Sequence, residues 1–171
     1  MKNELKRVVT IFMAGVARED ITPAVGTLLF GYNPFTESNS IHDPLQVTTI
    51  AFQQGETTSL LISVTLGGIQ NELAGEIRSK LCAKTGVPAE HIIIATTHTH
   101  SGPNTVGMEG WGEIDRYYVD TVLIPMILKT GHNAIQTLQP AELAVGVVRS
   151  EVGINRRKQY RDGRVDLGHN P

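Results

Sequence analysis

Two short apolar runs, separated by a helical pattern, constrain the fold of this chain more than any other part of its sequence. Residues 60–64 and 92–95 are nearly continuous in apolar side chains, as strands at the centre of a sheet are. Between them, four apolar residues recur at every fourth position and share one face of a helix: Ile69, Leu73, Ile77 and Leu81. Gly86 follows, where a helix C-terminal cap is expected. This strand–helix–strand unit predicts that its two strands pair in parallel.

Further strands and a second helix are predicted on both sides of this unit. Three segments have the apolar character of strands: residues 13–18, 47–53 and 143–148. A turn joins the second of them to the first apolar run, which predicts a hairpin. A helical pattern covers residues 113–138, and Pro125 predicts a kink or a break within it. Together these elements predict a layered α/β domain with a mixed central sheet flanked by helices.

The size and charge of the chain narrow its function class. Its 171 residues suit one domain or a piece of a larger one. We expect residues 1–12 to form an N-terminal extension and residues 13–171 to form the domain. The formal net charge is -2, which argues against a nucleic-acid-binding protein. No apolar run approaches the roughly 20 residues that a transmembrane helix needs.

The N-terminus and the single cysteine bear on where the protein works. Basic residues precede a short apolar run, as in a signal peptide. That run contains Thr10 and Gly15 and continues into sequence typical of a folded domain, so we interpret it as the first strand. Cys82 cannot form an internal disulfide, and its apolar neighbours on the predicted helix favour a packed thiol over a nucleophile. We therefore favour a cytoplasmic location.

The histidines of the segment His98-Thr99-His100 are the first candidates for chemistry. They follow the second apolar strand and enter a Gly-rich loop, which is where open α/β sheets bind ligands. Alternate residues of an extended backbone point to the same side, so both imidazoles can face one cleft and either can bind a metal. The spacing alone leaves a metal site and an ordinary loop both open. Ser101 lacks the strand-to-helix turn of a serine nucleophile.

Two other segments offer weaker candidates. The His42-Asp43 pair closes a long loop over residues 26–44, and it can bind a metal, orient another group or simply form a turn. Gly31 in the same loop allows the backbone to approach a ligand closely. Arg156 lies in a basic cluster near the C-terminus. Its guanidinium can bind a carboxylate through two hydrogen bonds or remain a solvated surface charge.

Five segments, in order along the chain, form a recognisable set: residues 14–23, 31–32, 41–45, 97–103 and 154–156. The most specific of them is the block Thr-His-Thr-His-Ser-Gly-Pro over residues 97–103. The set resembles the neutral/alkaline (non-lysosomal) ceramidase family. The chain is similar to the N-terminal portion of the catalytic domain of that family, over about residues 13 to 157.

The resemblance implies a zinc-dependent amidohydrolase that cleaves an N-acyl amide bond, with ceramide or a related N-acyl lipid as substrate. It implies that His98 is a zinc ligand, and that His100 and Arg156 are catalytic residues that contact the substrate near the scissile amide or the product carboxylate. It also implies substrate contacts from Gly31, to which we add His42. The chemistry of zinc is consistent with amide hydrolysis, because zinc lowers the pKa of a bound water to about 7 and so supplies hydroxide at neutral pH.

The chain also departs from the family. Thr65 stands where family members tend to carry an aspartate before the helix. The family completes its zinc site with a histidine, a glutamate and a tyrosine from much later in the chain, and its catalytic serine also lies downstream. One histidine cannot hold a zinc ion, which usually takes about three or four protein ligands. We therefore expect a truncated portion of such an enzyme that is inactive or very weak alone.

Two other functions fit part of the same sequence. A non-catalytic remnant or binding module keeps the fold and lacks the remaining zinc ligands and the serine. A barrel-type metal amidohydrolase also uses His-x-His, but on its first strand, whereas three strands and a helix precede the motif here.

An exposed sheet edge is expected, which allows a homo-oligomer or a contact with another chain. The family resemblance also leaves secretion open.

Overall fold

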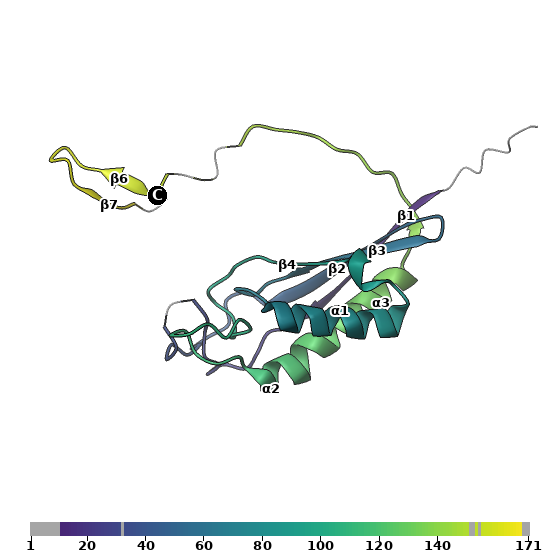
Figure 1. The fold of residues 1–171 in the computed structure, drawn as a ribbon, viewed down its shortest axis with the longest axis horizontal. Helices are drawn as coiled ribbons and strands as arrows, with labels where there is room; N and C mark the ends of the chain where they lie inside the picture. Colours follow the sequence, from purple (N-terminus) through teal and green to yellow (C-terminus); the bar gives the residue numbers. More distant parts are fainter. Residues whose placement is uncertain (1–10, 32, 151–152, 154, 169–171) are drawn as a thin grey trace, which may run out of the picture.

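A five-stranded mixed sheet forms the centre of the protein, in the order β4-β3-β2-β1-β5 (Figure 1). The computed structural model describes residues 11–31, 33–150, 153 and 155–168. The strands are β1 (Phe12–Asp20), β2 (Gln46–Gln54), β3 (Thr57–Val64), β4 (Ile92–Thr96) and β5 (Gln139–Pro140). β3 and β4 are parallel, whereas β1–β2, β2–β3 and β1–β5 are antiparallel pairs. The predicted mixed sheet, hairpin and parallel crossover are confirmed.

Two helices cover one face of this sheet (Figure 1). α1 (Asn71–Thr85) is the predicted crossover helix, and it ends at Gly86, whose φ of 77° is accessible to glycine without strain. α3 (Ile124–Gln136) packs beside it, against β1 and β2. A turn of 3₁₀ helix, η1 (Ala89–His91), leads into β4. Among the described residues, the helices flank the sheet on this one side.

The interruption at Pro125 takes the form of a π-helical segment. The helical region begins with α2 (Arg116–Tyr118), continues as η2 (Val119–Leu123) and only then becomes α3. Asp115 caps its start, because the carboxylate accepts the Tyr118 backbone N–H at 2.9 Å. Proline has no N–H to donate and crowds the carbonyl four residues earlier, so a wider turn before it relieves the crowding. The chain therefore passes Pro125 within one continuous helical region.

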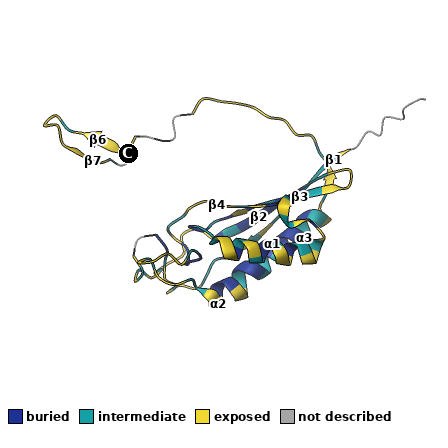
Figure 2. Ribbon diagram, in the orientation of Figure 1, coloured by how far each residue is buried: buried dark blue, intermediate teal, exposed yellow. Residues whose placement is uncertain are grey.

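The core lies between the sheet and the two helices (Figure 2). Alternate residues of β2 and β3 are buried in it: Val47, Thr49, Ala51, Leu60, Ile62 and Val64. α1 contributes three of the residues whose spacing predicted it: Leu73, Ile77 and Leu81. One polar link crosses this core, where Thr49 Oγ1 donates to Thr130 Oγ1 at 2.9 Å. Because Thr130 Oγ1 in turn donates to a helix carbonyl, burial leaves neither hydroxyl unsatisfied.

The prediction of a strand over residues 143–148 is wrong. The segment pairs with no strand among the described residues, and Leu143, Val145 and Val147 are largely exposed. Alternating apolar residues express a preference for a half-buried, pleated surface. They form a strand only where a neighbouring strand supplies hydrogen bonds, and β5 pairs with β1 only at Met13 and Ala14.

The chain continues into a small hairpin near its C-terminal end. β6 (Arg157–Gln159) and β7 (Val165–Leu167) pair antiparallel around Asp162-Gly163, and Gly163 has a φ of 85°. No helix in the described part of the chain is long and apolar enough to cross a membrane. Most of the expected N-terminal extension, residues 1–10, lies outside the described residues.

Candidate functional site

Strands β1, β3 and β4 end at the same edge of the sheet, and candidate residues gather there. β2 is antiparallel to both β1 and β3, and β4 is parallel to β3, so the three strands share one direction. Their carboxyl ends lead into loops over residues 21–45, 65–70 and 97–115. Leu29 and Pro103 form an isolated bridge between the first and the last of these loops. Open α/β sheets bind ligands at such an edge.

Two hydrogen bonds hold His98 at the start of the last loop. Its backbone N–H donates to the Leu66 carbonyl at 3.0 Å, and its Nδ1 lies 2.6 Å from the Gly67 carbonyl. A carbonyl only accepts hydrogen bonds, so Nδ1 carries the proton and Nε2 presents a lone pair. Metal-binding histidines are usually oriented in this way by an acceptor on the far side of the ring.

The backbone of His98 adopts a left-handed conformation, with a φ of 61°. Among the described residues it is the one non-glycine residue with a positive φ. This conformation costs a residue with a Cβ about 1–2 kcal/mol, and such strain clusters at functional sites. The extended backbone expected from the sequence is therefore not present at His98. Hydrogen bonds to the Leu66 and Gly67 carbonyls orient its ring instead.

The imidazoles of His98 and His100 converge. Their Nε2 atoms are 3.4 Å apart, and the rings are nearly perpendicular, with centroids 5.0 Å apart. Zinc binds histidine nitrogen at about 2.0–2.1 Å in tetrahedral sites, which places two ligand nitrogens about 3.3 Å apart. The pair thus fits two corners of a zinc site, and it equally fits a hydrogen bond between the rings. Within the described ranges, no cluster of three or more His, Cys, Asp or Glu side chains could hold a metal ion.

Gly31 and two aromatic rings pack around His100. Gly31 has a φ of 112°, and a Cβ built on it would overlap the His100 ring. Only glycine therefore allows the imidazole to lie here. Phe30 meets the His100 ring edge-on, with centroids 6.3 Å apart, and Trp111 contacts Phe30 at 5.9 Å. Tyr32, from the predicted Gly-Tyr segment, lies outside the described residues.

Asn104 organises the loop that carries Trp111. Its amide nitrogen donates to the carbonyls of Trp111 and Gly112 at 3.0 and 2.9 Å. Its Oδ1 accepts the backbone N–H groups of Val106 and Gly107 at 3.0 and 3.1 Å. These four bonds use both donors and both acceptor positions of the side chain, which is buried. Asn104 therefore fixes the loop from inside.

Sequence reasoning missed the residues that support the imidazole pair. It named neither Asn104 nor the Gly67 carbonyl, and it assigned no role to Phe30 or Trp111. The available signals were a glycine pair after an apolar strand and an asparagine after Gly-Pro. Each signal also fits an ordinary turn, so neither one identifies a site by itself.

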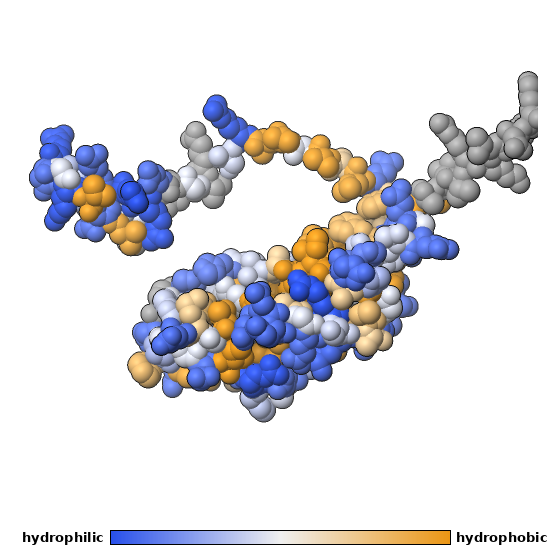
Figure 3. Space-filling model, viewed as in Figure 1, coloured by the Kyte–Doolittle hydropathy of each residue, from blue (hydrophilic) through white to orange (hydrophobic). Residues whose placement is uncertain are grey.

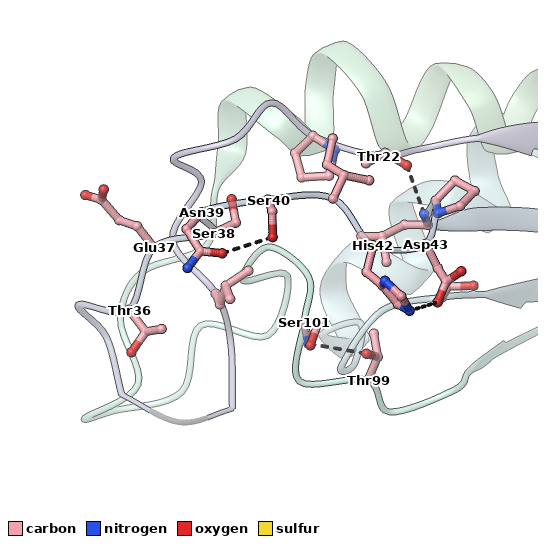
Figure 4. A pocket seen from close by; sticks show the side chains of 16 residues that line it. Thr22, Thr36, Glu37, Ser38, Asn39, Ser40, His42, Asp43, Thr99 and Ser101 are labelled. Atoms are coloured by element: carbon pink, nitrogen blue, oxygen red, sulfur yellow. Dashed lines mark hydrogen bonds and ion pairs between the residues drawn. The ribbon is translucent and has the colours of Figure 1, made fainter.

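A cavity of about 650 Å³ opens beside the histidine segment. Figure 4 shows the hydroxyl groups that line much of it, with His42 on one side and Thr99 and Ser101 on another. Neither imidazole of the pair lines this cavity. Thr99 and Ser101, which alternate in sequence with the two histidines, line the cavity, whereas the two imidazoles do not.

His42 and Arg156 lie apart from the imidazole pair. The His42 side chain is 97% exposed. Its 3.7 Å contact with Asp43 lies at the surface, where such a contact contributes little to stability. Arg156 adjoins the β6–β7 hairpin, which Figure 1 shows away from the sheet. Over the described residues, the hydrogen bonds of 155–168 stay within that segment. The structure therefore brings together three of the five predicted site residues: Gly31, His98 and His100.

Comparisons with known proteins bear on the fold. No family model and no curated protein matches the sequence. Among solved structures, neutral ceramidase from Pseudomonas aeruginosa matches with a TM-score of 0.67 and 22% identity, covering 77% of this chain and 22% of that chain. A structure described as ceramidase complexed with C2 gives a TM-score of 0.66 with the same identity and coverage. The chain spans 22% of the ceramidase chains that it matches, and it has the fold of that part of neutral ceramidase, as its sequence resemblance predicted.

Proposed function

We propose that this chain takes part in the zinc-dependent hydrolysis of an N-acyl amide bond, with ceramide or a related N-acyl lipid as substrate. The observation that carries the proposal is the convergence of the His98 and His100 Nε2 atoms at the carboxyl ends of β3 and β4. The ceramidase-like fold of the same residues supports it. In this proposal, residues 13–171 are the N-terminal portion of a larger catalytic unit.

The proposed roles follow from the chemistry of each side chain. His98 binds zinc through Nε2, while the Gly67 carbonyl keeps its Nδ1 protonated. Zinc, when bound, polarises the amide carbonyl and supplies hydroxide at neutral pH. His100 contacts the substrate beside the scissile amide, where an imidazole can donate to developing negative charge. Arg156 binds the carboxylate product through two parallel hydrogen bonds.

Gly31 and His42 are proposed to bind the substrate. Gly31 lacks a side chain, so its backbone can approach a bound molecule closely on the His100 side of the loop. His42 lies at the cavity beside the histidine segment, where it can contact hydroxyl groups of the amine portion. The two residues therefore contact different parts of one substrate in this proposal.

The proposal requires metal ligands beyond those the structure describes. Zinc takes about three or four protein ligands, and in this proposal the described residues supply one of them, His98. The remaining donors come from outside the described residues or from another polypeptide. We therefore expect this chain alone to bind zinc weakly, and we expect amidase activity only where the full ligand set is present.

Calorimetric zinc titration tests the metal site independently of activity. His98→Ala is expected to lower the zinc affinity of the chain by at least about tenfold, because it removes the proposed ligand. His100→Ala is expected to change the affinity little, since His100 acts on the substrate in this proposal. His132→Ala is the matched control, because His132 is exposed on α3, away from the pair. Zinc affinity that survives His98→Ala contradicts the ligand assignment.

An amidase assay tests the substrate. We expect the longest product of the gene to release fatty acid from N-acyl sphingosine, to lose this activity on chelation and to regain it with zinc. Arg156→Ala is expected to reduce kcat by a larger factor than it reduces the zinc content. The reason is that Arg156 acts on the product carboxylate. A zinc-loaded protein that leaves N-acyl sphingosine intact contradicts the substrate, and cleavage without metal contradicts the mechanism.

A further inference from the structure

The face of the sheet opposite the helices is apolar and uncovered, and we call it the open face. Strand register places four apolar side chains in one row across it: Val16, Ile50, Leu61 and Ile93. Val16 is 57% exposed and Ile93 is 60% exposed. Phe12 and Phe52 stack near one end of the row, with ring centroids 6.0 Å apart. Among the described residues, no helix covers this surface (Figure 1).

The composition of the open face is unusual for a sheet surface that meets water. Antiparallel sheets with one solvated face normally carry polar side chains on it. Here the middle of the face is apolar, and polar contacts such as Arg18 Nε to Thr48 Oγ1, at 3.1 Å, lie at the end of β1. Contiguous exposed apolar surface of this kind marks an interaction site.

A second unpartnered apolar surface belongs to the same chain. Residues 141–150, which we call the arm, follow β5 and run on the side of the sheet away from α1 and α3 (Figure 1). Figure 3 shows a run of hydrophobic residues along this arm. Leu143, Val145 and Val147 occupy alternate positions, so an extended backbone turns all three side chains the same way. Val147 is 96% exposed.

We propose that the arm packs onto the open face of its own chain, with the side chains of Leu143, Val145 and Val147 against the sheet. Both surfaces are apolar, and both lie on the same side of the sheet. β5 tethers the arm beside the open face, which gives it a millimolar effective concentration there. A second copy of the chain at ordinary protein concentration is far more dilute, so the occupant is the arm of the same molecule. Packing removes apolar surface of both partners from water.

The length of the arm suits this face. Pro140 pairs with Met13 near one end of β1, and Asp20 marks the other end. The seven residue-to-residue steps from Met13 to Asp20 span about 23 Å, and the ten residues of an extended arm span about 33 Å. A turn of about four residues beyond β5 reverses the direction of the arm, and the remaining residues, about 20 Å long, reach the row at Val16 and beyond it. Docking of the arm also carries Arg156 towards the carboxyl ends of β3 and β4. A catalytic role for Arg156 there rests on the proposed function.

Thiol labelling at two neighbouring arm positions tests the docking. In a Cys82→Ser background, Val147→Cys places a thiol on the packed side, and Val148→Cys places one on the opposite side. We expect the thiol at position 147 to react with a maleimide about tenfold more slowly than the thiol at position 148, because only the first is covered. Equal rates at the two positions overturn the proposal.

Substitutions on the open face supply the second half of the test. Val16→Asp and Ile93→Asp each place a charge under the packed arm, and each is expected to raise the labelling rate at Val147→Cys to that at Val148→Cys. Val25→Asp is the matched control, because Val25 is 54% exposed in a loop outside the open face. A slow rate that neither face variant changes overturns the proposal. Protection that disappears on dilution overturns it in favour of a second copy.

These experiments distinguish a failure of the docking proposal from a failure of the proposed function. A slowly labelled thiol at position 147, in a protein without zinc or amidase activity, supports docking and contradicts only the proposed function. Equal labelling rates in a protein with amidase activity contradict docking and support the proposed function. Trp111 is the single tryptophan of the chain, so an unchanged emission spectrum shows that the face variants keep their fold.

Discussion

At the scale of single residues, Gly31 determines where the His100 imidazole lies. Gly31→Ala introduces a Cβ that overlaps the ring, in a residue that must also hold a φ of 112°. We expect the variant to lose about 1–3 kcal/mol of unfolding free energy through backbone strain. We also expect the His100 ring to move away from His98. Urea unfolding measures the first effect, and nuclear Overhauser contacts between the two rings measure the second.

Gly26→Ala is the matched control for this substitution. Gly26 has a φ of 94°, so alanine there is strained in a similar way, but a Cβ would meet no atom within 4 Å. The control is therefore expected to lose similar stability and to keep the contact between the His98 and His100 rings. A ring contact that survives Gly31→Ala would show that the glycine does not position His100.

The sequence predicted the members of the imidazole pair but not how they are held. The His-x-His spacing at the end of an apolar strand indicated that His98 and His100 could face one cleft. The support of His98 comes from the Gly67 carbonyl, 31 residues away in the sequence, and no periodicity links the two. Such long-range contacts depend on the assembled sheet, so a local pattern cannot reveal them.

At the scale of elements, Asn104 holds the loop that follows β4. Asn104→Ala removes four hydrogen bonds and leaves the Trp111 and Gly112 carbonyls without that partner. At about 0.5–1.5 kcal/mol for each bond, we expect a loss of about 2–6 kcal/mol in unfolding free energy. The contact between Trp111 and Phe30 is also expected to loosen. Urea unfolding and a red shift of tryptophan emission measure the two effects.

Asn39→Ala controls for the loss of an asparagine amide. Asn39 lies in an exposed loop, and its side chain accepts a hydrogen bond from the Ser40 hydroxyl at 3.1 Å. Little change in stability is expected, because water replaces an exposed hydrogen bond. If Asn104→Ala behaves like this control and leaves Trp111 emission unchanged, the loop does not depend on the buried amide.

Elements that bury one face were predictable, and elements that lack a packing partner were not. The spacing of apolar residues predicted α1, and apolar runs predicted β3 and β4, because these patterns report burial. Residues 143–148 carry the same alternation without a partner strand, so the prediction there was wrong. The β6 and β7 strands are exposed throughout, and each is only three residues long, too short for a periodic pattern to predict. Pro125 predicted a kink or a break, and the structure has a π-helical segment before the proline instead.

At the scale of the whole molecule, stability depends on how closely the helices approach the sheet. Gly15 of β1 lies under the end of α3, and a Cβ there would overlap the Ala134 carbonyl. Gly15→Ala is therefore expected to cost about 1–3 kcal/mol of unfolding free energy. Gly75→Ala lies on the exposed side of α1 in open space, so it is expected to stabilise by about 0.5–1 kcal/mol. Opposite shifts of the urea midpoint are expected, and shifts of the same sign contradict this account.

Tyr118 joins the helical region to the end of β1 and makes global stability sensitive to alkaline pH. Its buried hydroxyl donates to the Ile21 carbonyl at 2.7 Å. Burial raises the pKa of this hydroxyl above its usual value of about 10, and the Asp115 and Asp20 carboxylates add to the rise. Above about pH 10, the unfolded chain therefore loses a proton that the folded protein keeps. Stability then falls as pH rises, by up to about 1.4 kcal/mol per pH unit.

A single substitution separates this alkaline effect from the other tyrosines. Tyr118→Phe removes the hydrogen bond, so at neutral pH it is expected to be less stable than the unsubstituted protein by about 0.5–1.5 kcal/mol. Because phenylalanine has no proton to lose, its stability is expected to decline less above about pH 10, and the difference between the two proteins narrows. Tyr117→Phe is the matched control, since Tyr117 is 80% exposed, and its curve is expected to follow that of the unsubstituted protein. Urea unfolding from neutral to alkaline pH measures all three curves, and parallel curves for Tyr118→Phe and the unsubstituted protein exclude Tyr118 as the source.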